Sequence, residues 1–151
     1  MKGFKPIALL FAGLSFMLGM GVPLAQVDKT PPRIIHIPVM SAEEGEEVTV
    51  EAVVTDEVSG VLSVTLYYRR VGEELYESVE MSPFYDSYRA KIPGSYVVPD
   101  GVEYYIVARD LAGNEATLPE ISPADNPLRI SVTPVGALRE APVVVSGSPP
   151  E

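Results

Sequence analysis

The sequence predicts an all-β domain built as a seven-stranded antiparallel sandwich. Short segments alternate apolar and polar residues with period two, and clusters of Gly, Pro, Asn and Asp separate them. No segment carries an apolar stripe at helical spacing. The expected strands cover residues 33–39, 48–55, 62–70, 75–81, 88–92, 102–110 and 128–132.

Prolines and turn residues delimit the first two strands. Pro31 and Pro32 favour extended chain, and Pro38 removes a ladder donor, so residues 33–39 are expected at a sheet edge. Gly45 lies in the turn between the first two strands. Residues 48–55 alternate strictly, which predicts an inward face made of Val48, Val50, Ala52 and Val54.

The middle strands have the same pattern. Turn residues at 56–60 precede the third strand, whose predicted inward face is Leu62, Val64, Leu66 and Tyr68. Gly72 turns the chain into the fourth strand, which Ser82 and Pro83 end. A loop rich in Pro and Gly separates the fifth strand from the sixth, whose predicted inward face is Val102, Tyr104, Ile106 and Ala108.

One register pairs strands 62–70 and 102–110 sensibly if they are antiparallel neighbours. It places Val64 opposite Ala108, Leu66 opposite Ile106, Tyr68 opposite Tyr104, Thr65 opposite Val107, Tyr67 opposite Tyr105 and Arg69 opposite Glu103. Tyr104 is then expected at a tyrosine corner, with its hydroxyl bonded to backbone near residues 99–101.

Composition excludes several classes of protein. The 151 residues allow one domain, and the lack of Cys excludes disulfides, Cys-ligated metals and thiol nucleophiles. A net charge of −10 argues against nucleic acid as a partner, because phosphate binding needs clustered basic residues.

The N-terminal residues predict export. Lys2 and Lys5 precede an uncharged stretch from residue 7 to 22, which is shorter than the ~20 residues that span a bilayer. This pattern is typical of a secretory signal peptide over residues 1–25, cleaved after Gly21 or Ala25; an uncleaved anchor is the alternative. Cleavage after Ala25 removes two lysines and no acid, so the net charge becomes −12.

The remaining chain divides into three parts. Residues 26–30 are expected to be a linker, residues 31–132 the sandwich, and residues 133–151 a Pro-rich, disordered tail. After cleavage no stable membrane span is expected, and the predicted location is the periplasm or exterior of a bacterium.

Several phrases of the sequence resemble bacterial immunoglobulin-like and fibronectin-type-III-like modules. They are DKTPP at 28–32, IIHIPV at 34–39, VLSVTLYYR at 61–69, and EYYIVARD at 103–110 together with Gly113 and Asn114. The resemblance covers most of residues 28–132. It implies a sandwich fold and a role as spacer, adhesion unit or accessory domain of an exported protein.

Catalytic candidates reduce to His36, the only imidazole. No G-x-S-x-G elbow is present, the glycines stand singly at turns, and the paired carboxylates at 43–44, 46–47 and 73–74 fall in turns. We therefore expect a surface or turn-bonding histidine, no catalytic or cofactor-binding residues, and no enzyme activity.

Acidic residues gather at one end of the expected sandwich. The topology brings the start of the first strand and two loops to the same pole, with Asp28, Asp56, Glu57, Asp110 and Asn114. Oxygen ligands from separate loops suit Ca²⁺, whereas Asp and Asn beside Gly are also ordinary turn residues. We favour turn chemistry and keep Ca²⁺ as the alternative.

The outer face of the two paired strands is the second candidate surface. Tyr67, Arg69 and Tyr105 form an amphipathic patch that suits a carbohydrate or a protein loop, although Tyr is also a good strand former. The expected function is a structural or protein-interaction module whose partner is an envelope or extracellular protein. The alternative is a module stabilised by Ca²⁺ or binding carbohydrate.

Overall fold

The computed structural model describes residues 27–136. The predicted signal peptide at 1–25 and residues 137–151 of the predicted tail lie outside the described residues. Within residues 27–136, no helix is long and apolar enough to cross a membrane.

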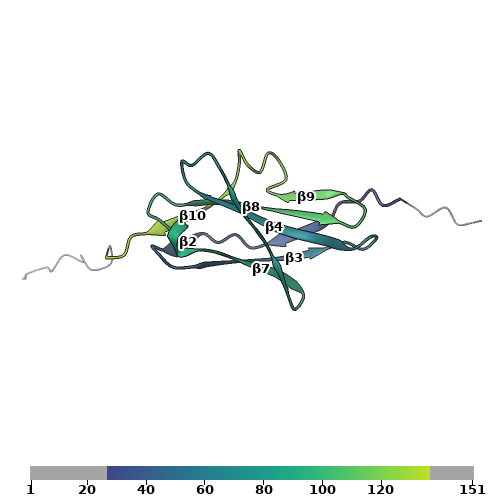
Figure 1. Ribbon diagram of the computed structural model, residues 1–151, viewed down its shortest axis with the longest axis horizontal. Helices are drawn as coiled ribbons and strands as arrows, with labels where there is room; N and C mark the ends of the chain where they lie inside the picture. Colours follow the sequence, from purple (N-terminus) through teal and green to yellow (C-terminus); the bar gives the residue numbers. More distant parts are fainter. Residues whose placement is uncertain (1–26, 137–151) are drawn as a thin grey trace, which may run out of the picture.

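Two sheets face each other and form a sandwich (Figure 1). The four-stranded sheet has the order β1-β3-β7-β6, and the six-stranded sheet has the order β2-β10-β8-β4-β5 with β9 paired to β8. The elements are β1 (Arg33–His36), β2 (Ser41–Glu43), β3 (Val48–Thr55), β4 (Val61–Arg70), β5 (Glu77–Glu80), β6 (Ser82–Phe84), β7 (Ser87–Ile92), the 3-10 helix η1 (Gly94–Tyr96), β8 (Val102–Asp110), β9 (Glu115–Leu118) and β10 (Leu128–Thr133).

The prediction of seven antiparallel strands is wrong in number and in one direction. The described residues form ten strands, and β2 pairs with β10 in parallel, with Ser131 opposite Ser41. The additional strands β2, β6 and β9 have only three or four residues. Such segments are too short to display an alternating pattern, so only their pairing partners define them.

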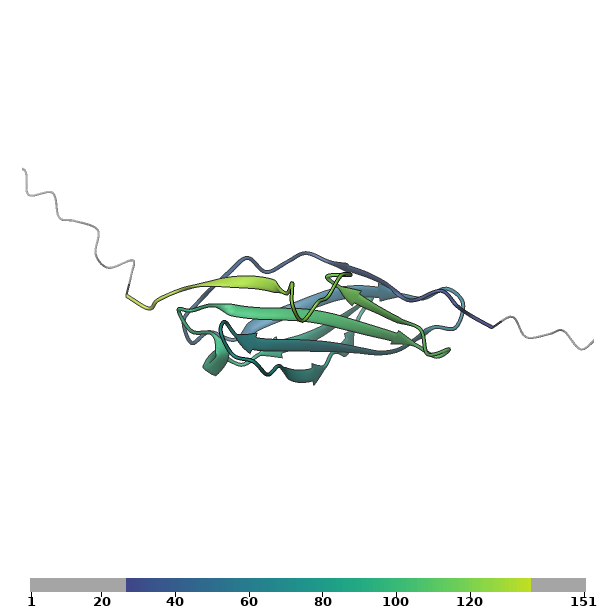
Figure 2. The ribbon, with the colours of Figure 1, turned by 90° about the horizontal axis from the view of Figure 1, so that it is seen from above.

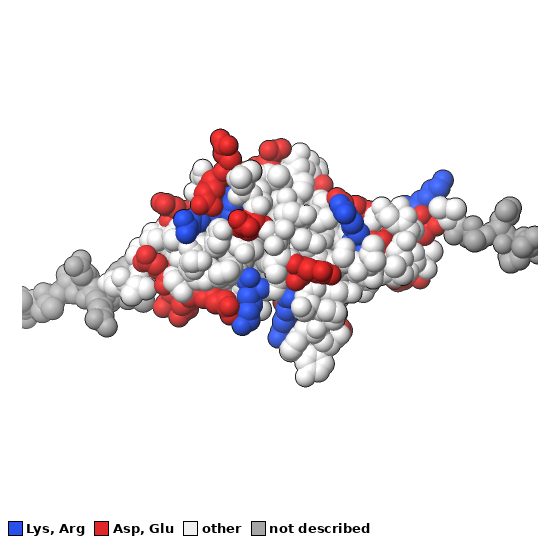
Figure 3. Space-filling view, viewed as in Figure 1, with Lys and Arg blue, Asp and Glu red and all other residues white. Residues whose placement is uncertain are grey.

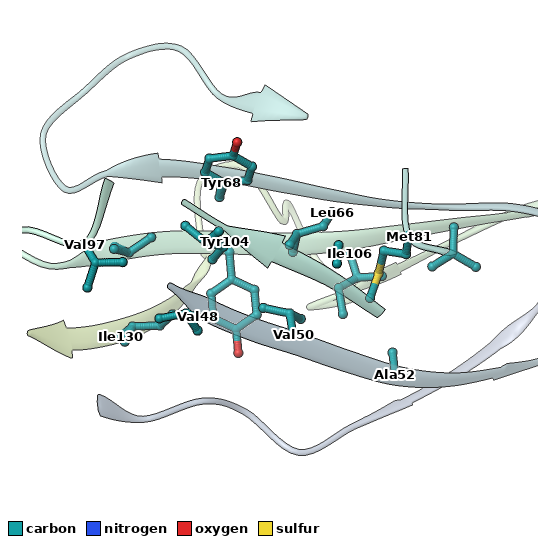
Figure 4. Close-up of a cluster of buried hydrophobic side chains, with 14 of the residues drawn as sticks. Val48, Val50, Ala52, Leu66, Tyr68, Met81, Val97, Tyr104, Ile106 and Ile130 are labelled. Carbon is teal, nitrogen blue, oxygen red and sulfur yellow. The ribbon is translucent and has the colours of Figure 1, made fainter. Parts of the chain in front are cut away.

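The predicted fourth strand ends early because the chain changes sheets. β5 pairs with β4 in the six-stranded sheet, whereas β6, the next strand along the chain, pairs with β7 in the four-stranded sheet. Met81 lies between them, donates its backbone N–H to the Val64 carbonyl, and is 2% exposed. The Met81 side chain therefore fills the space between the two sheets at the point of crossing (Figure 4).

The alternation of β3 and β8 is confirmed. All four predicted inward residues of β3 and all four of β8 are buried in one core cluster (Figure 4). In β4, Val64, Leu66 and Tyr68 are also buried, but Leu62 is 59% exposed. The Leu62 prediction is wrong because the register shifts between Val61 and Ser63, and an irregularity of this kind reverses which side chains face inward.

The predicted register of the central strand pair is confirmed. β4 and β8 are antiparallel, and all six predicted pairs occur, among them Leu66 opposite Ile106 and Tyr67 opposite Tyr105. Matching residue character across two strands therefore identified the central pair of the six-stranded sheet.

The sandwich is elongated, and the chain passes through it from end to end. The described chain begins at one end of the long axis and finishes at the opposite end, and two perpendicular views agree on this (Figures 1 and 2). The loops after β3 and β8 lie at the end where the chain begins, because the start of β1 pairs with the end of β3.

Candidate functional site

His36 is part of a partly buried hydrogen-bond relay. Its Nδ1 lies 2.6 Å from the Glu51 carbonyl oxygen, and its Nε2 lies 2.8 Å from the Tyr104 hydroxyl. The same hydroxyl accepts the Val39 backbone N–H at 3.0 Å. The predicted tyrosine corner is therefore wrong, because Tyr104 bonds the chain after β1 rather than residues 99–101.

The His36 side chain is half-buried rather than on the surface. Burial lowers the pKa of His36, and the hydrogen bond to the Glu51 carbonyl opposes that shift only in part. Both ring nitrogens already have partners, and neither partner is a Ser or Thr hydroxyl. The relay joins β1 and β3 of the four-stranded sheet to β8 of the six-stranded sheet, which is a structural role.

A groove lies between β1 and β9 on the surface of the described residues. It has a volume of ≈ 700 Å³ and is lined by residues 31–34, 115–118 and Glu120. Its hydroxyl group, on Thr117, bonds the Pro119 carbonyl, and Glu115 is paired with Arg109.

Three of the predicted pole residues meet. One carboxylate oxygen from each of Asp28, Asp56 and Asp110 lies within 4.8 Å of the others. We call this cluster the acidic pole. Asp28 precedes β1, Asp56 comes directly after β3, and Asp110 ends β8, so three separate segments supply it.

Backbone pairing brings these segments together. Arg33 of β1 pairs with Thr55 of β3, so the chain before β1 lies beside the chain after β3. The Leu111 N–H donates to the Gly60 carbonyl, which joins the loop after β3 to the loop after β8. The acidic pole is thus a consequence of strand order.

Asp56 and Asp110 are held by hydrogen bonds to their own loops. Asp56 Oδ1 accepts the backbone N–H groups of Val58, Ser59 and Gly60. These bonds, led by the one from Gly60, hold the pKa of Asp56 below its ordinary value. Burial raises the pKa of Asp110, but hydrogen bonds from the side chain and backbone of Asn114 and from nearby amides outweigh it, so this pKa is lowered too.

Asn114 and Glu57 are not part of the carboxylate cluster. Asn114 Nδ2 donates to Asp110 Oδ2 at 2.7 Å and to the backbone carbonyls of Asp28 and Thr30 at 3.3 and 3.4 Å. These three partners only accept, which directs the amide nitrogen toward them and makes Asn114 a positioning residue. Glu57 is exposed and does not belong to the cluster.

The aromatic rings of the predicted Tyr face pack against one another. The rings of Tyr67 and Tyr105 stack at 4.7 Å with an interplanar angle of 5°. Tyr76 packs its edge against Tyr105 at 4.9 Å, and the Arg69 guanidinium lies 4.1 Å from the Tyr76 ring. Each ring face that touches a neighbour is unavailable to a ligand, so this packing favours a structural role.

Sequence reasoning missed two features of the surface. Tyr76, which was predicted inside the strand at 75–81, lies before β5 and packs against Tyr105, and its hydroxyl bonds the Ala124 carbonyl 48 residues away. The hairpin of β6 and β7 projects from the sandwich and carries Phe84 at the end of β6 and Tyr85 in the turn, which are 39% and 93% exposed (Figure 1). No alternation or motif marks this turn; an unbroken Phe-Tyr pair after Pro83 was the available signal.

Charge is dispersed over the visible surface. On the face shown in Figure 3, acidic and basic side chains are interspersed, and no continuous basic stripe is present. One buried carboxylate makes two ion pairs: Glu103, with a side chain 10% exposed, lies 2.9 Å from Arg69 and 2.7 Å from Arg129. Burial raises the pKa of Glu103, but the two arginines lower it below its ordinary value.

Comparison with known proteins gives similarity to solved structures and no match to a family model or a curated protein. A solved structure of a 1.5-MDa bacterial ice-binding adhesin, described in connection with host cell surface retention, is similar at a TM-score of 0.41 and 18% identity. The match covers 71% of this chain and 34% of that chain, so this chain spans about a third of the adhesin structure's length.

Proposed function

We propose that this protein is an exported, non-enzymatic structural or protein-interaction module of the bacterial envelope or exterior. The observation that carries the proposal is the path of the chain through an elongated sandwich, from one end of the long axis to the other (Figure 2). A domain with this path places the first and the last described residues at opposite ends of the long axis, which is the geometry of a spacer or an adhesion unit.

Two further observations support the proposal. The basic start and uncharged stretch at residues 1–25 favour export. The only histidine is engaged on both nitrogens, so it is not free to act as a general base.

Fractionation of the producing bacterium tests the location. The chain should be found in the periplasm or the medium, with a new N-terminus after Gly21 or Ala25. A variant with Lys2→Glu and Lys5→Glu is the matched control, because it removes the basic start and leaves the sandwich unchanged. This variant should accumulate inside the cell, and a wild-type chain found there at full length would overturn the proposal.

Attachment assays then separate the two roles. Cells that lack the chain should attach less to a surface or to one another if it is an adhesion unit, and expression of the wild-type chain should restore attachment. Unchanged attachment with normal export favours a spacer.

A further inference from the structure

The acidic pole places three carboxylates together with no basic side chain beside them in the described part of the chain. Asp110 is fully buried and Asp28 is 9% exposed, and one oxygen from each lies within 4.8 Å of the other and of Asp56. Among residues 27–136, no Lys or Arg nitrogen lies within 4 Å of any of the three. Like charges this close repel one another strongly when they are shielded from water.

One oxygen at the acidic pole has no partner. Asp28 Oδ1 accepts the Thr30 N–H at 2.9 Å, but Oδ2 is buried and makes no hydrogen bond. A buried carboxylate oxygen without a partner is destabilising, because it has lost its bonds to water and gained none. Turn chemistry explains Oδ1 of Asp28 and Oδ1 of Asp56, but it does not explain Oδ2 of Asp28.

From these two observations we propose that Asp28, Asp56 and Asp110 bind a Ca²⁺ ion. Ca²⁺ takes oxygen ligands at 2.3–2.6 Å, so two ligands of one ion are at most about 5 Å apart, which fits a cluster within 4.8 Å. The three donors are all carboxylates, and no His or Cys joins them, which favours Ca²⁺ over zinc.

The loops already hold the ligands in place. Asp56 Oδ1 takes three backbone N–H groups, and both oxygens of Asp110 are bonded by Asn114. Asn114 Nδ2 also reaches the Asp28 carbonyl, so it ties the segment before β1 to the loop after β8. An ion at this point clamps the segment before β1 to the ends of β3 and β8.

The test is thermal unfolding of the full chain, expressed for export and purified in EDTA, with and without added CaCl₂. A site of the affinity usual for extracellular modules has a Kd of about 10⁻⁴–10⁻³ M, so about 10 mM Ca²⁺ should raise Tm by roughly 5–10 °C. Calorimetric titration with CaCl₂ should show one saturable site, and MgCl₂ at the same concentration should raise Tm less.

Two variants that each remove one negative charge make the test specific. Asp28→Asn should abolish the Ca²⁺-dependent rise and keep the fold, since in EDTA its Tm should equal or exceed that of the wild type as repulsion is relieved. Glu57→Gln is the matched control, because Glu57 is an exposed acid next to Asp56 and outside the cluster. It should retain the full rise.

Two results would overturn the proposal. One is a wild-type Tm that does not respond to Ca²⁺, with no saturable heat of binding. The other is an equal response in Asp28→Asn and Glu57→Gln, which would indicate nonspecific screening of the negative charge. The outcome is independent of the proposed function, because the site is tested on purified protein and the role is tested in cells.

Discussion

His36 illustrates what single residues do in this molecule. The Glu51 carbonyl can only accept, so Nδ1 carries a proton and donates to it. In the neutral ring Nε2 then accepts the Tyr104 O–H, and the Tyr104 oxygen accepts the Val39 N–H. A proton on Nε2 would reverse the middle bond and leave the Tyr104 O–H without this partner.

We predict that the free energy of unfolding falls as the pH is lowered from 7.5 to 5.5. The folded pKa of His36 lies below 6.5, so the unfolded chain binds the proton more readily. Stability is therefore complete above about pH 6.5 and declines as the pH falls through that value toward the folded pKa. Urea unfolding at several pH values measures the decline, which should disappear in His36→Gln. Equal slopes for both proteins would show that His36 is not the group responsible.

At the scale of elements, alternation and cross-strand matching were sufficient for the longest strands. β3, β4 and β8 have eight to ten residues each, so the period-two pattern repeats several times and identifies the inward face. The inward prediction for Leu62 is wrong because the register of β4 against β8 shifts between Val61 and Ser63, at Leu62 itself. The same argument explains the missed β2, β6 and β9, which are too short to carry a period.

The stacked pair on β4 and β8 should stabilise the sheet. We predict that Tyr67→Ala and Tyr105→Ala are each destabilising and that a double-mutant cycle gives a coupling of about 0.5–1.5 kcal/mol, as expected for an aromatic pair. Urea unfolding provides the measurement. Tyr67→Ala combined with Tyr85→Ala is the control, because Tyr85 lies at the turn after β6 and the two effects should add.

A binding assay on the same variants tests the carbohydrate alternative. If the Tyr face is structural, a glycan array should give the same result for the wild type and for the Tyr67→Ala/Tyr105→Ala protein. Glycan binding that is lost in this double variant, and kept when Tyr85 alone is changed, would assign a ligand to the face.

At the scale of the whole molecule, the two sheets are joined where the chain crosses between them. Met81 is 2% exposed and packs in the shared core, whereas Met40 is 71% exposed (Figure 4). We predict that Met81→Ala lowers the free energy of unfolding by about 2–4 kcal/mol, through lost burial and a cavity between the sheets. Met40→Ala should change it by less than about 0.5 kcal/mol. Similar losses in the two variants would contradict this account of the crossing.

The acidic pole was predicted from the sequence only in part. Sequence reasoning placed Asp28, Asp56, Glu57, Asp110 and Asn114 near one pole because strand order decides which loops are neighbours. In the structure only the three aspartates form the cluster, with one oxygen from each within 4.8 Å of the others. Glu57 is exposed outside it, and Asn114 positions Asp110. That distinction depends on side-chain direction within turns, which a pattern of residue types does not contain.

Residue order is sufficient to predict the all-β class, the inward faces of β3 and β8, and the pairing of β4 with β8. These features result from local periodicity and from the matching of side chains across a strand pair. The parallel pairing of β2 with β10 and the bond between His36 and Tyr104 across 68 residues join segments remote in the chain, so they depend on how the two sheets pack. The burial of Asp28 Oδ2 likewise depends on packing, because Asp28 lies beside Asp56 and Asp110 from distant segments.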